Sequence, residues 1–206
     1  MMTTDASRDG DVFADLPEID VDAQRRLHTR LAAAAADAGI LDVAYRTIDT
    51  PVGTLLLAAT GNGLVRVAYG REDHDRVLEQ LAERISPRVL RAPARLDLAA
   101  HEIDEYFAGR RDAFDLPLDL QLSHGFRRDV LGHLSEIGYG RTASYAAVAA
   151  AAGHPRAVRA AATACSTNPL PVVVPCHRVI RSDGKIGKYV GGVEAKQTLL
   201  RMEAAA

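Results

Sequence analysis

The chain has 206 residues, which is enough for one large domain or two small ones with a hydrophobic core. Hydrophobic residues make up 48% and charged residues 25%, a balance that excludes a chain disordered throughout, a collagen and a coiled coil. The net charge of -2 argues against a nucleic-acid partner for the chain as a whole. However, residues 121–206 hold 11 basic and 5 acidic residues, while residues 1–120 hold 14 and 22. This split favours a polyanionic partner for the C-terminal part, with chance as the alternative.

The cysteine content and the apolar runs of the sequence indicate the cellular compartment of the protein. Cys165 and Cys176 are too few for a disulfide framework, and without a CxxC spacing they do not predict a zinc site. No apolar run approaches the roughly 18 residues that a membrane span requires. The acidic N-terminus lacks the apolar core of a secretory signal. We therefore expect a cytoplasmic protein with no membrane partner and no metal.

The first half of the chain predicts an N-terminal extension and a small α+β domain. The extension, residues 1–42, is polar and acidic at first and then forms one helix that ends at Gly39. Residues 43–70 predict three short strands separated by turns at 50–53 and 60–63. Two amphipathic helices follow at 73–85 and 96–109, and residues 114–118 fit a last strand. In the second helix we expect Leu98, Ile103, Tyr106 and Phe107 to face inward.

The second half predicts mainly helices. After a helix at 125–137, a short helix begins near a cap at Thr142 or Ser144 and ends at Gly153. A second helix over 155–166 follows, with Pro155 in its first turn. Together these form a helix-turn-helix whose second helix exposes arginines among small alanines. Such a helix reads the major groove of DNA, inserts a side chain from the minor groove, or is an ordinary surface helix.

A buried apolar run leads directly into Pro175-Cys176-His177-Arg178. A cysteine reacts as its thiolate, so a working Cys176 needs a neighbouring cation, base or helix end. Adjacent residues of an extended chain point opposite ways, so contact between Cys176 and His177 requires a turn or a bridging water. Three interpretations stay open at this point: a buried structural cysteine, a peptidase-type nucleophile, or an acceptor that keeps the group it receives.

Two further elements belong with this segment. Residues 185–192 form a glycine-rich loop around Tyr189, in which glycines permit close approach to a flat ligand and the tyrosine can stack or donate a hydrogen bond. The spacing is not that of a phosphate-binding loop. A final amphipathic helix carries Glu203, and a carboxylate near His177 would fix the tautomer of the imidazole and strengthen it as a base.

These residues together resemble one family. The run PCHRVI, preceded by Asn168-Pro169 and followed by Gly-Lys-Tyr-Val-Gly-Gly and the helix with Glu203, resembles the 6-O-alkylguanine-DNA alkyltransferases, or methylated-DNA–protein-cysteine methyltransferases. The resemblance is strong over 125–203 and weaker from 43 onward, and it leaves out residues 1 to about 40. It implies an α+β chain: a ribonuclease-H-like α/β domain at 43–120, then a mostly helical, winged-helix-like domain at 121–206 that binds DNA and accepts the alkyl group.

The resemblance also implies a mechanism. A monomer would bind double-stranded DNA through the minor groove, rotate a 6-O-alkylguanine out of the stack and transfer its alkyl group irreversibly to Cys176, once per molecule and without a cofactor. 4-O-Alkylthymine is a second candidate substrate. Glu203 would orient His177, which deprotonates Cys176 through a water, while Asn168 braces this network and Tyr145 protonates the leaving guanine. The DNA contacts would be Arg156, Arg159, Ala160 and Ser182, with Arg159 filling the gap in the stack, and the base pocket would comprise Pro175, Val179, Tyr189 and Val190.

The chain departs from the family pattern at two points. Val190 stands where many relatives have a small hydroxyl residue or glycine, and no cysteine precedes Cys165, which excludes the N-terminal zinc of some relatives. Two other hypotheses compete with repair. A non-enzymatic binder of alkylated DNA would lack the acceptor Cys176. A helix-turn-helix regulator would not explain why Asn168, Tyr189 and Glu203 occur together.

Overall fold

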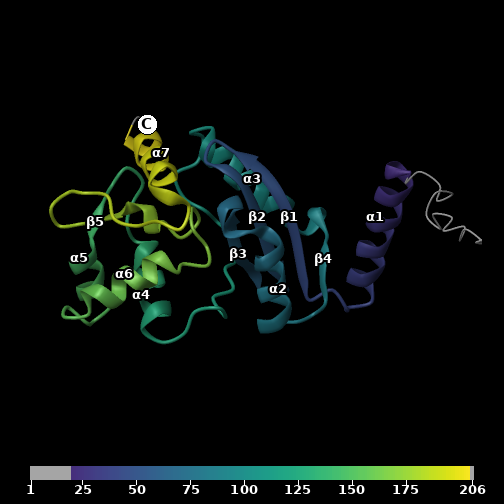
Figure 1. The fold of residues 1–206 in the computed structure, drawn as a ribbon, viewed down its shortest axis with the longest axis horizontal. Coiled ribbons are helices and arrows are strands. Elements are labelled where there is room, and N and C mark those ends of the chain that lie inside the picture. The colour runs from purple at the N-terminus through teal and green to yellow at the C-terminus, as the bar shows by residue number, and fades with distance from the viewer. Residues whose placement is uncertain (1–19, 205–206) are drawn as a thin grey trace, which may run out of the picture.

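The computed structural model describes residues 20–204 and shows an α+β fold, as expected, with a sheet part followed by a helical part (Figure 1). The predicted strands are β1 (Val43–Thr50), β2 (Gly53–Thr60) and β3 (Gly63–Tyr69), joined as antiparallel neighbours. A strand that the sequence did not indicate, β4 (Val89–Arg91), pairs in parallel with β1 and gives the order β3-β2-β1-β4. With three residues, it is too short to show alternation.

Helices cover both faces of this sheet. α2 (His74–Arg84) packs Val77 and Leu81 against one face, and α3 (Asp97–Phe107) belongs to the core on the other. Successive residues of a strand point to opposite faces, so the apolar β2 serves both cores: Leu55 and Leu57 face α3, and Leu56 faces α2. The run of apolar residues in β2 therefore reflects burial on two sides.

Three details of the sequence prediction are wrong. Leu98 is 57% exposed. It lies five positions before the buried Ile103, and two residues five positions apart in an α-helix point to nearly opposite sides of the helix. Residues 114–118 form no strand. They make only an isolated bridge between Leu64 and Leu118, since Pro117 has no N–H with which to continue a ladder. The second helix of the helix-turn-helix begins at Val158, so Pro155 precedes it instead of lying in its first turn.

The helical part comprises α4 (Phe126–Leu134), α5 (Tyr145–Ala151), α6 (Val158–Ser166) and α7 (Gly192–Ala204). Ser144 caps α5 by accepting a hydrogen bond from the Ala147 amide at 3.1 Å, which confirms one of the two predicted caps. A short parallel pair, β5 (Ala143–Ser144) and β6 (Val179–Ile180), connects the start of α5 to the segment that follows Cys176. This pairing places the helix-turn-helix beside the chemistry-bearing segment.

The sheet part and the helical part share one core. Strand β3 contacts the segment before Cys176: the Val67 amide donates to the Pro169 carbonyl at 2.8 Å, and the Arg66 guanidinium donates to the same oxygen at 3.2 Å. One hydrophobic cluster contains residues of both parts, among them Ile103, Tyr106 and Cys176. Side chains of the sheet part can therefore reach the site.

Helix α1 (Val21–Asp37) stands at the opposite end of the molecule from the helical part (Figure 1). Asp20 caps it, and Gly39 follows it with a φ of +65°, as predicted. Its His28 ring contacts the Arg91 carbonyl at 2.9 Å, which connects α1 to β4. The earlier residues of the predicted extension lie outside the described part of the chain. Within that part, no helix is long and apolar enough to cross a membrane.

Candidate active site

The segment between α6 and Cys176 is buried and tightly turned. Val172 adopts a φ of 74°, which is unusual for a β-branched residue and costs about 1–3 kcal/mol. The chain then forms a single 3-10 turn over Cys176–Arg178. The sequence allowed a turn or a bridging water here; the turn is present, and both Cys176 and His177 are buried in it without a direct hydrogen bond between them in the described structure.

Asn168 connects the end of α6 to the cysteine. Its Nδ2 donates to Cys176 Sγ at 3.1 Å and to the Val174 carbonyl at 2.8 Å, while its Oδ1 accepts from the Leu170 amide at 2.9 Å. Both ends of the amide are thus used, which fixes its orientation. The predicted bracing position of Asn168 is therefore present in the geometry.

Cys176 is held as a protonated thiol. Burial raises its pKa to about 11, although the Asn168 hydrogen bond and the charge of Lys196 act in the opposite direction. Thiols react as thiolates, so this cysteine needs a base at the moment of reaction. Among residues 20–204 no direct hydrogen bond joins it to His177.

Glu203, near the end of α7, is the centre of a buried polar cluster. Its carboxylate accepts from His177 Nε2 at 2.8 Å, from Arg178 Nε at 2.9 Å and from the Tyr106 hydroxyl at 2.6 Å. Burial by itself would raise the pKa of Glu203, but the hydrogen bonds from His177 and Arg178 outweigh burial and lower it to about 2. The carboxylate is therefore ionised across the physiological range.

The ionised Glu203 determines the state of His177. Burial lowers the pKa of His177, so the ring is neutral at pH 7. A carboxylate only accepts hydrogen bonds, so Nε2 carries the proton and Nδ1 carries the lone pair. Nδ1 is buried and has no hydrogen-bond partner in the described structure. His177 thus presents an unprotonated nitrogen that can act as a base.

Three residues of this cluster were not predicted as site residues. Arg178 lies within the PCHR motif, where its position next to His177 was a usable signal. Tyr106 comes from α3 in the sheet part, 97 positions from Glu203, and the sequence suggested only packing. Lys196 is fully buried in α7 and donates to the Val179 carbonyl at 2.5 Å.

Tyr145 and the glycine-rich loop lie against each other. Tyr145 begins α5 directly after β5, and burial raises the pKa of this half-buried tyrosine to about 12. A Cβ at Gly187 would collide with the Tyr145 hydroxyl, and one at Gly191 would collide with the Tyr69 ring. Glycine is thus required at both positions for contact with the protein's own tyrosines, whereas the sequence argument had considered only a ligand.

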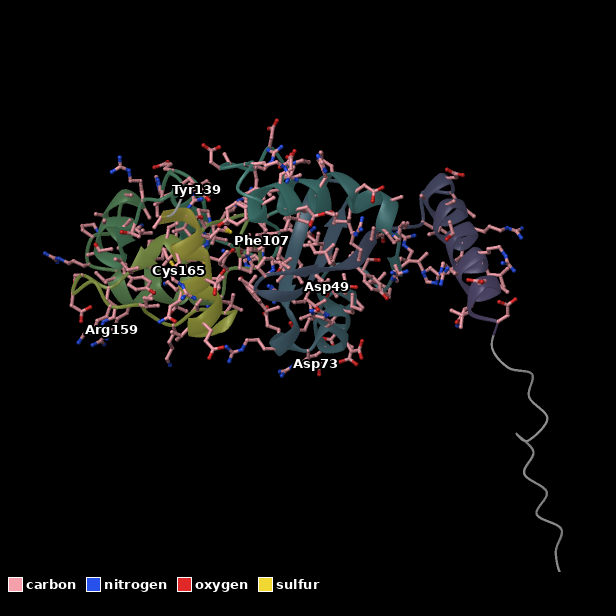
Figure 2. The ribbon with its side chains drawn as sticks, turned by 90° about the horizontal axis from the view of Figure 1, so that it is seen from above. Asp49, Asp73, Phe107, Tyr139, Arg159 and Cys165 are labelled. Carbon is pink, nitrogen blue, oxygen red and sulfur yellow. The ribbon has the colours of Figure 1, made fainter. Side chains whose placement is uncertain are left out.

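The residues predicted to contact DNA are exposed at the end of the molecule away from α1. Arg159 and Ala160 lie in the first turn of α6, Arg156 precedes that helix, and Ser182 follows β6. Figure 2 shows Arg159 projecting at the outer edge of the helical part, with Cys165 inside it. The buried Cys165 is a core residue, and burial raises its pKa to about 12.

The four predicted pocket residues do not line one open cavity. Tyr189 and Val179 are buried near the cysteine, but Val190 borders a cavity of about 370 Å³ between the two parts. Pro175 borders another cavity of about 270 Å³, together with Arg178. Cys176 itself is only 1% exposed, so its thiol is largely shielded from solvent.

Fold and site together define a two-part α+β protein with a helix-turn-helix and a buried thiol beside a histidine–glutamate pair. The family model for the DNA-binding domain of 6-O-methylguanine DNA methyltransferases matches residues 125–205, and the model for their ribonuclease-like domain matches residues 43–120. The chain therefore belongs to the 6-O-methylguanine DNA methyltransferase family. It is a methyltransferase of DNA repair, as the resemblance predicted.

Individual relatives agree with this assignment. The methylated-DNA–protein-cysteine methyltransferase of Mycolicibacterium paratuberculosis is 39% identical over 161 residues, which cover 78% of this chain and 92% of that protein. The constitutive enzyme of that name from Bacillus subtilis is 38% identical over 160 residues, 77% of this chain and 94% of that protein. The crystal structure of Mycobacterium tuberculosis O6-methylguanine methyltransferase superposes with a TM-score of 0.69 at 36% identity, covering 79% of this chain and 93% of that one.

A second similar solved structure contains DNA. Mycobacterium tuberculosis OGT in complex with DNA superposes with a TM-score of 0.68 at 36% identity, again over 79% of this chain and 93% of that one. The matched regions begin at residue 43, so α1 lies outside both family models.

Proposed function

We propose that this protein repairs DNA by moving the alkyl group of 6-O-alkylguanine in a duplex irreversibly onto its own Cys176. The observation that carries the proposal is the presence of two buried hydrogen-bonded pairs, Asn168–Cys176 and His177–Glu203, on adjacent residues within the part that matches the DNA-binding domain. In the reaction the Sγ–carbon bond forms as the carbon–oxygen bond of the lesion breaks. The thioether is stable, so each molecule acts once.

Activation of the thiol starts from Glu203. The ionised carboxylate holds the Nε2 proton of His177 and so keeps Nδ1 free to accept a proton. Nδ1 takes the proton of Cys176 through a bridging water, because the two side chains make no direct bond among the described residues. The Asn168 amide donates to the sulfur and stabilises the thiolate as it forms.

The leaving group needs a proton of its own. Expulsion of a guanine anion is unfavourable, and general-acid catalysis contributes about 10²–10⁴-fold. Tyr145 supports this role because it is protonated at neutral pH, with a pKa of about 12, and lies against the loop that carries Tyr189. Tyr145 thus donates its proton to the departing base.

The buried thiol requires that the base leave the DNA stack. A base inside a duplex cannot reach a side chain that is 1% exposed, so the lesion is rotated into the site. The exposed Arg159, Arg156, Ala160 and Ser182 are positioned for contact with the duplex, and Arg159 fills the gap that the base leaves. The DNA complex of the similar Mycobacterium tuberculosis OGT supports this partner.

The proposal also covers the oligomeric state, the cellular compartment and the substrate range of the protein. A single copy of the chain contains every residue used above, so we propose a monomer. Both cysteines are free and one must stay reduced, which favours the cytoplasm. 4-O-Alkylthymine is the second substrate to assay.

The test follows the alkyl group. The protein is incubated with duplex DNA that contains labelled 6-O-methylguanine, and label on the protein is counted. We expect one label per molecule for the wild type, none for Cys176→Ala, and wild-type labelling for Cys165→Ala, which removes the other buried thiol. Persistent labelling of Cys176→Ala would contradict the mechanism. Binding without transfer by the wild type would favour the non-enzymatic lesion binder.

A further inference from the structure

Strand β3 of the sheet part ends in a tyrosine that reaches the glycine-rich loop of the helical part. Tyr69 and Tyr189 are both buried, and their hydroxyl oxygens are 3.0 Å apart. Their rings meet edge to face, with centroids 5.7 Å apart and an interplanar angle of 74°. The sheet part therefore touches the side chain that is proposed to line the base pocket.

The backbone of the loop is fitted to this contact. A Cβ at Gly191 would lie 2.5 Å from the Tyr69 ring, which real contacts do not allow. At Gly192 the φ of +91° is unfavourable for other residues, and a Cβ there would only displace the flexible end of the Arg71 side chain. Gly191 thus lets the loop close against Tyr69, and Gly192 permits the turn that begins α7.

The position of Tyr189 matters for the reacting groups. Its ring lies edge-on to the His177 ring at 6.4 Å, and the ammonium of Lys196 lies 6.0 Å from the centre of the same ring. Lys196 in turn donates to the carbonyl of Val179, directly after the Cys176 turn. A displacement of Tyr189 would therefore be transmitted to the neighbours of the thiol.

The two hydroxyls share one hydrogen bond but hold two protons. Either oxygen can be the donor in the free protein. If Tyr69 donates to the Tyr189 oxygen, the proton of Tyr189 is available to an acceptor on a base in the pocket. If Tyr189 donates to Tyr69 instead, the Tyr189 proton is engaged in that hydrogen bond and is not available to the base.

We propose that Tyr69 is a positioning residue for alkyl transfer: it fixes the Tyr189 ring and, as the donor of their hydrogen bond, directs the Tyr189 proton toward the bound base. This inference rests on the function proposed above and adds a role for the sheet part. Tyr69 itself does not touch the base. It acts only through Tyr189.

The first variant removes only the hydroxyl group of Tyr69. Tyr69→Phe keeps the ring against Gly191 and deletes the hydroxyl, and Tyr45→Phe is the matched control, since Tyr45 packs on the other face of the same sheet. Methyl transfer is measured in a single turnover at saturating DNA, and the Kd for DNA and the Tm are measured separately. We expect transfer by Tyr69→Phe to be about 2- to 10-fold slower, the value for one lost hydrogen bond, with the Kd for DNA matching the control and the Tm lowered because a buried hydrogen bond is lost.

A second variant reports on specificity. Tyr69→Ala opens space beside Gly191 and frees the loop, so the ratio of benzyl to methyl transfer should rise several-fold above that of the wild type. Uniform loss of stability would not move this ratio. Equal rates for Tyr69→Phe and Tyr45→Phe, or an unchanged ratio for Tyr69→Ala, would overturn the role of Tyr69. Failure of the proposed function itself is distinct, because the wild type would then acquire no label.

Discussion

The sheet part and the helical part supply different kinds of groups to the same site. The helical part contributes the thiol, the imidazole and the carboxylate, which are Cys176, His177 and Glu203. The sheet part contributes only the phenol groups of Tyr106 and Tyr69, one bonded to Glu203 and the other to Tyr189. The difference suggests a division between groups that react and groups that orient them. Substitutions in the two parts should therefore differ in size and in kind.

The largest effect is expected in the helical part at Tyr145. Tyr145→Phe removes the proposed general acid while keeping the ring, so methyl transfer should slow by about 10²–10⁴-fold. Single-turnover transfer from labelled DNA measures this loss. Binding of the same DNA should change much less, since the variant keeps the exposed face of α6. A loss smaller than that of Tyr69→Phe would break the comparison between the two parts.

The second-largest effect is a loss of stability at acidic pH that arises from Glu203. Its pKa falls from an ordinary 4.5 to about 2 on folding, so the ionised form stabilises the native state above pH 4.5 and this contribution is lost as the pH falls toward 2. The contribution is on the order of 3 kcal/mol. In Glu203→Gln, the free energy of unfolding should lose this part of its dependence between pH 4.5 and 2.

Urea unfolding of the wild type and Glu203→Gln at a series of pH values measures that difference. Glu136→Gln is the control, because that carboxylate is exposed and contacts only His133. Parallel curves for the wild type and Glu203→Gln would contradict the assignment of an ionised, buried Glu203.

The third effect tests the sheet part. Tyr106→Phe deletes a 2.6 Å hydrogen bond to a buried carboxylate, and bonds to charged groups contribute about 1.5–3 kcal/mol. We expect a loss of stability of that size and a smaller loss of transfer rate, because Arg178 and His177 still hold Glu203. Denaturant unfolding and single-turnover kinetics on one preparation separate the two. A rate loss as large as that of Tyr145→Phe would assign Tyr106 to the reacting groups.

The smallest effect concerns the exposed surface. Arg156→Ala removes one candidate phosphate contact, so the slope of log K for nonspecific DNA against log salt should decrease by about 0.9. Arg159→Ala should leave this slope nearly unchanged, because Arg159 is proposed to enter the base stack. Binding is measured between roughly 50 and 200 mM salt. Affinity that does not change with salt would refute the role of the basic C-terminal part.

Much of the helical part could be predicted from the sequence because its signals are local. Asn168, Cys176 and His177 lie within a few residues of each other, and Ser144 and Gly153 mark helix ends by their own chemistry. The first three strands could be predicted because turn residues separate them, and the helices that follow give the α+β class. The strand predicted at 114–118 was wrong, because Pro117 cannot continue a ladder, and the helix predicted from Pro155 begins only at Val158.

The contribution of the sheet part to the site could not be predicted in this way. The contacts of Tyr69 and Tyr106 join residues 120 and 97 positions apart, and no periodicity within a single element encodes such a pair. Both tyrosines also fit the apolar pattern of the strand or helix that carries them. In the same way, Gly191 looked suited to a ligand, whereas its nearest neighbour is Tyr69.

The burial of Cys176 has a consequence for the lifetime of the protein in the cell. A molecule that can react only once is lost if its sulfur meets an oxidant or a stray electrophile first. With a pKa of about 11, the thiolate makes up about one part in ten thousand at pH 7, and the side chain is 1% exposed. The site thus keeps its thiol protonated and shielded from solvent until the target base is bound.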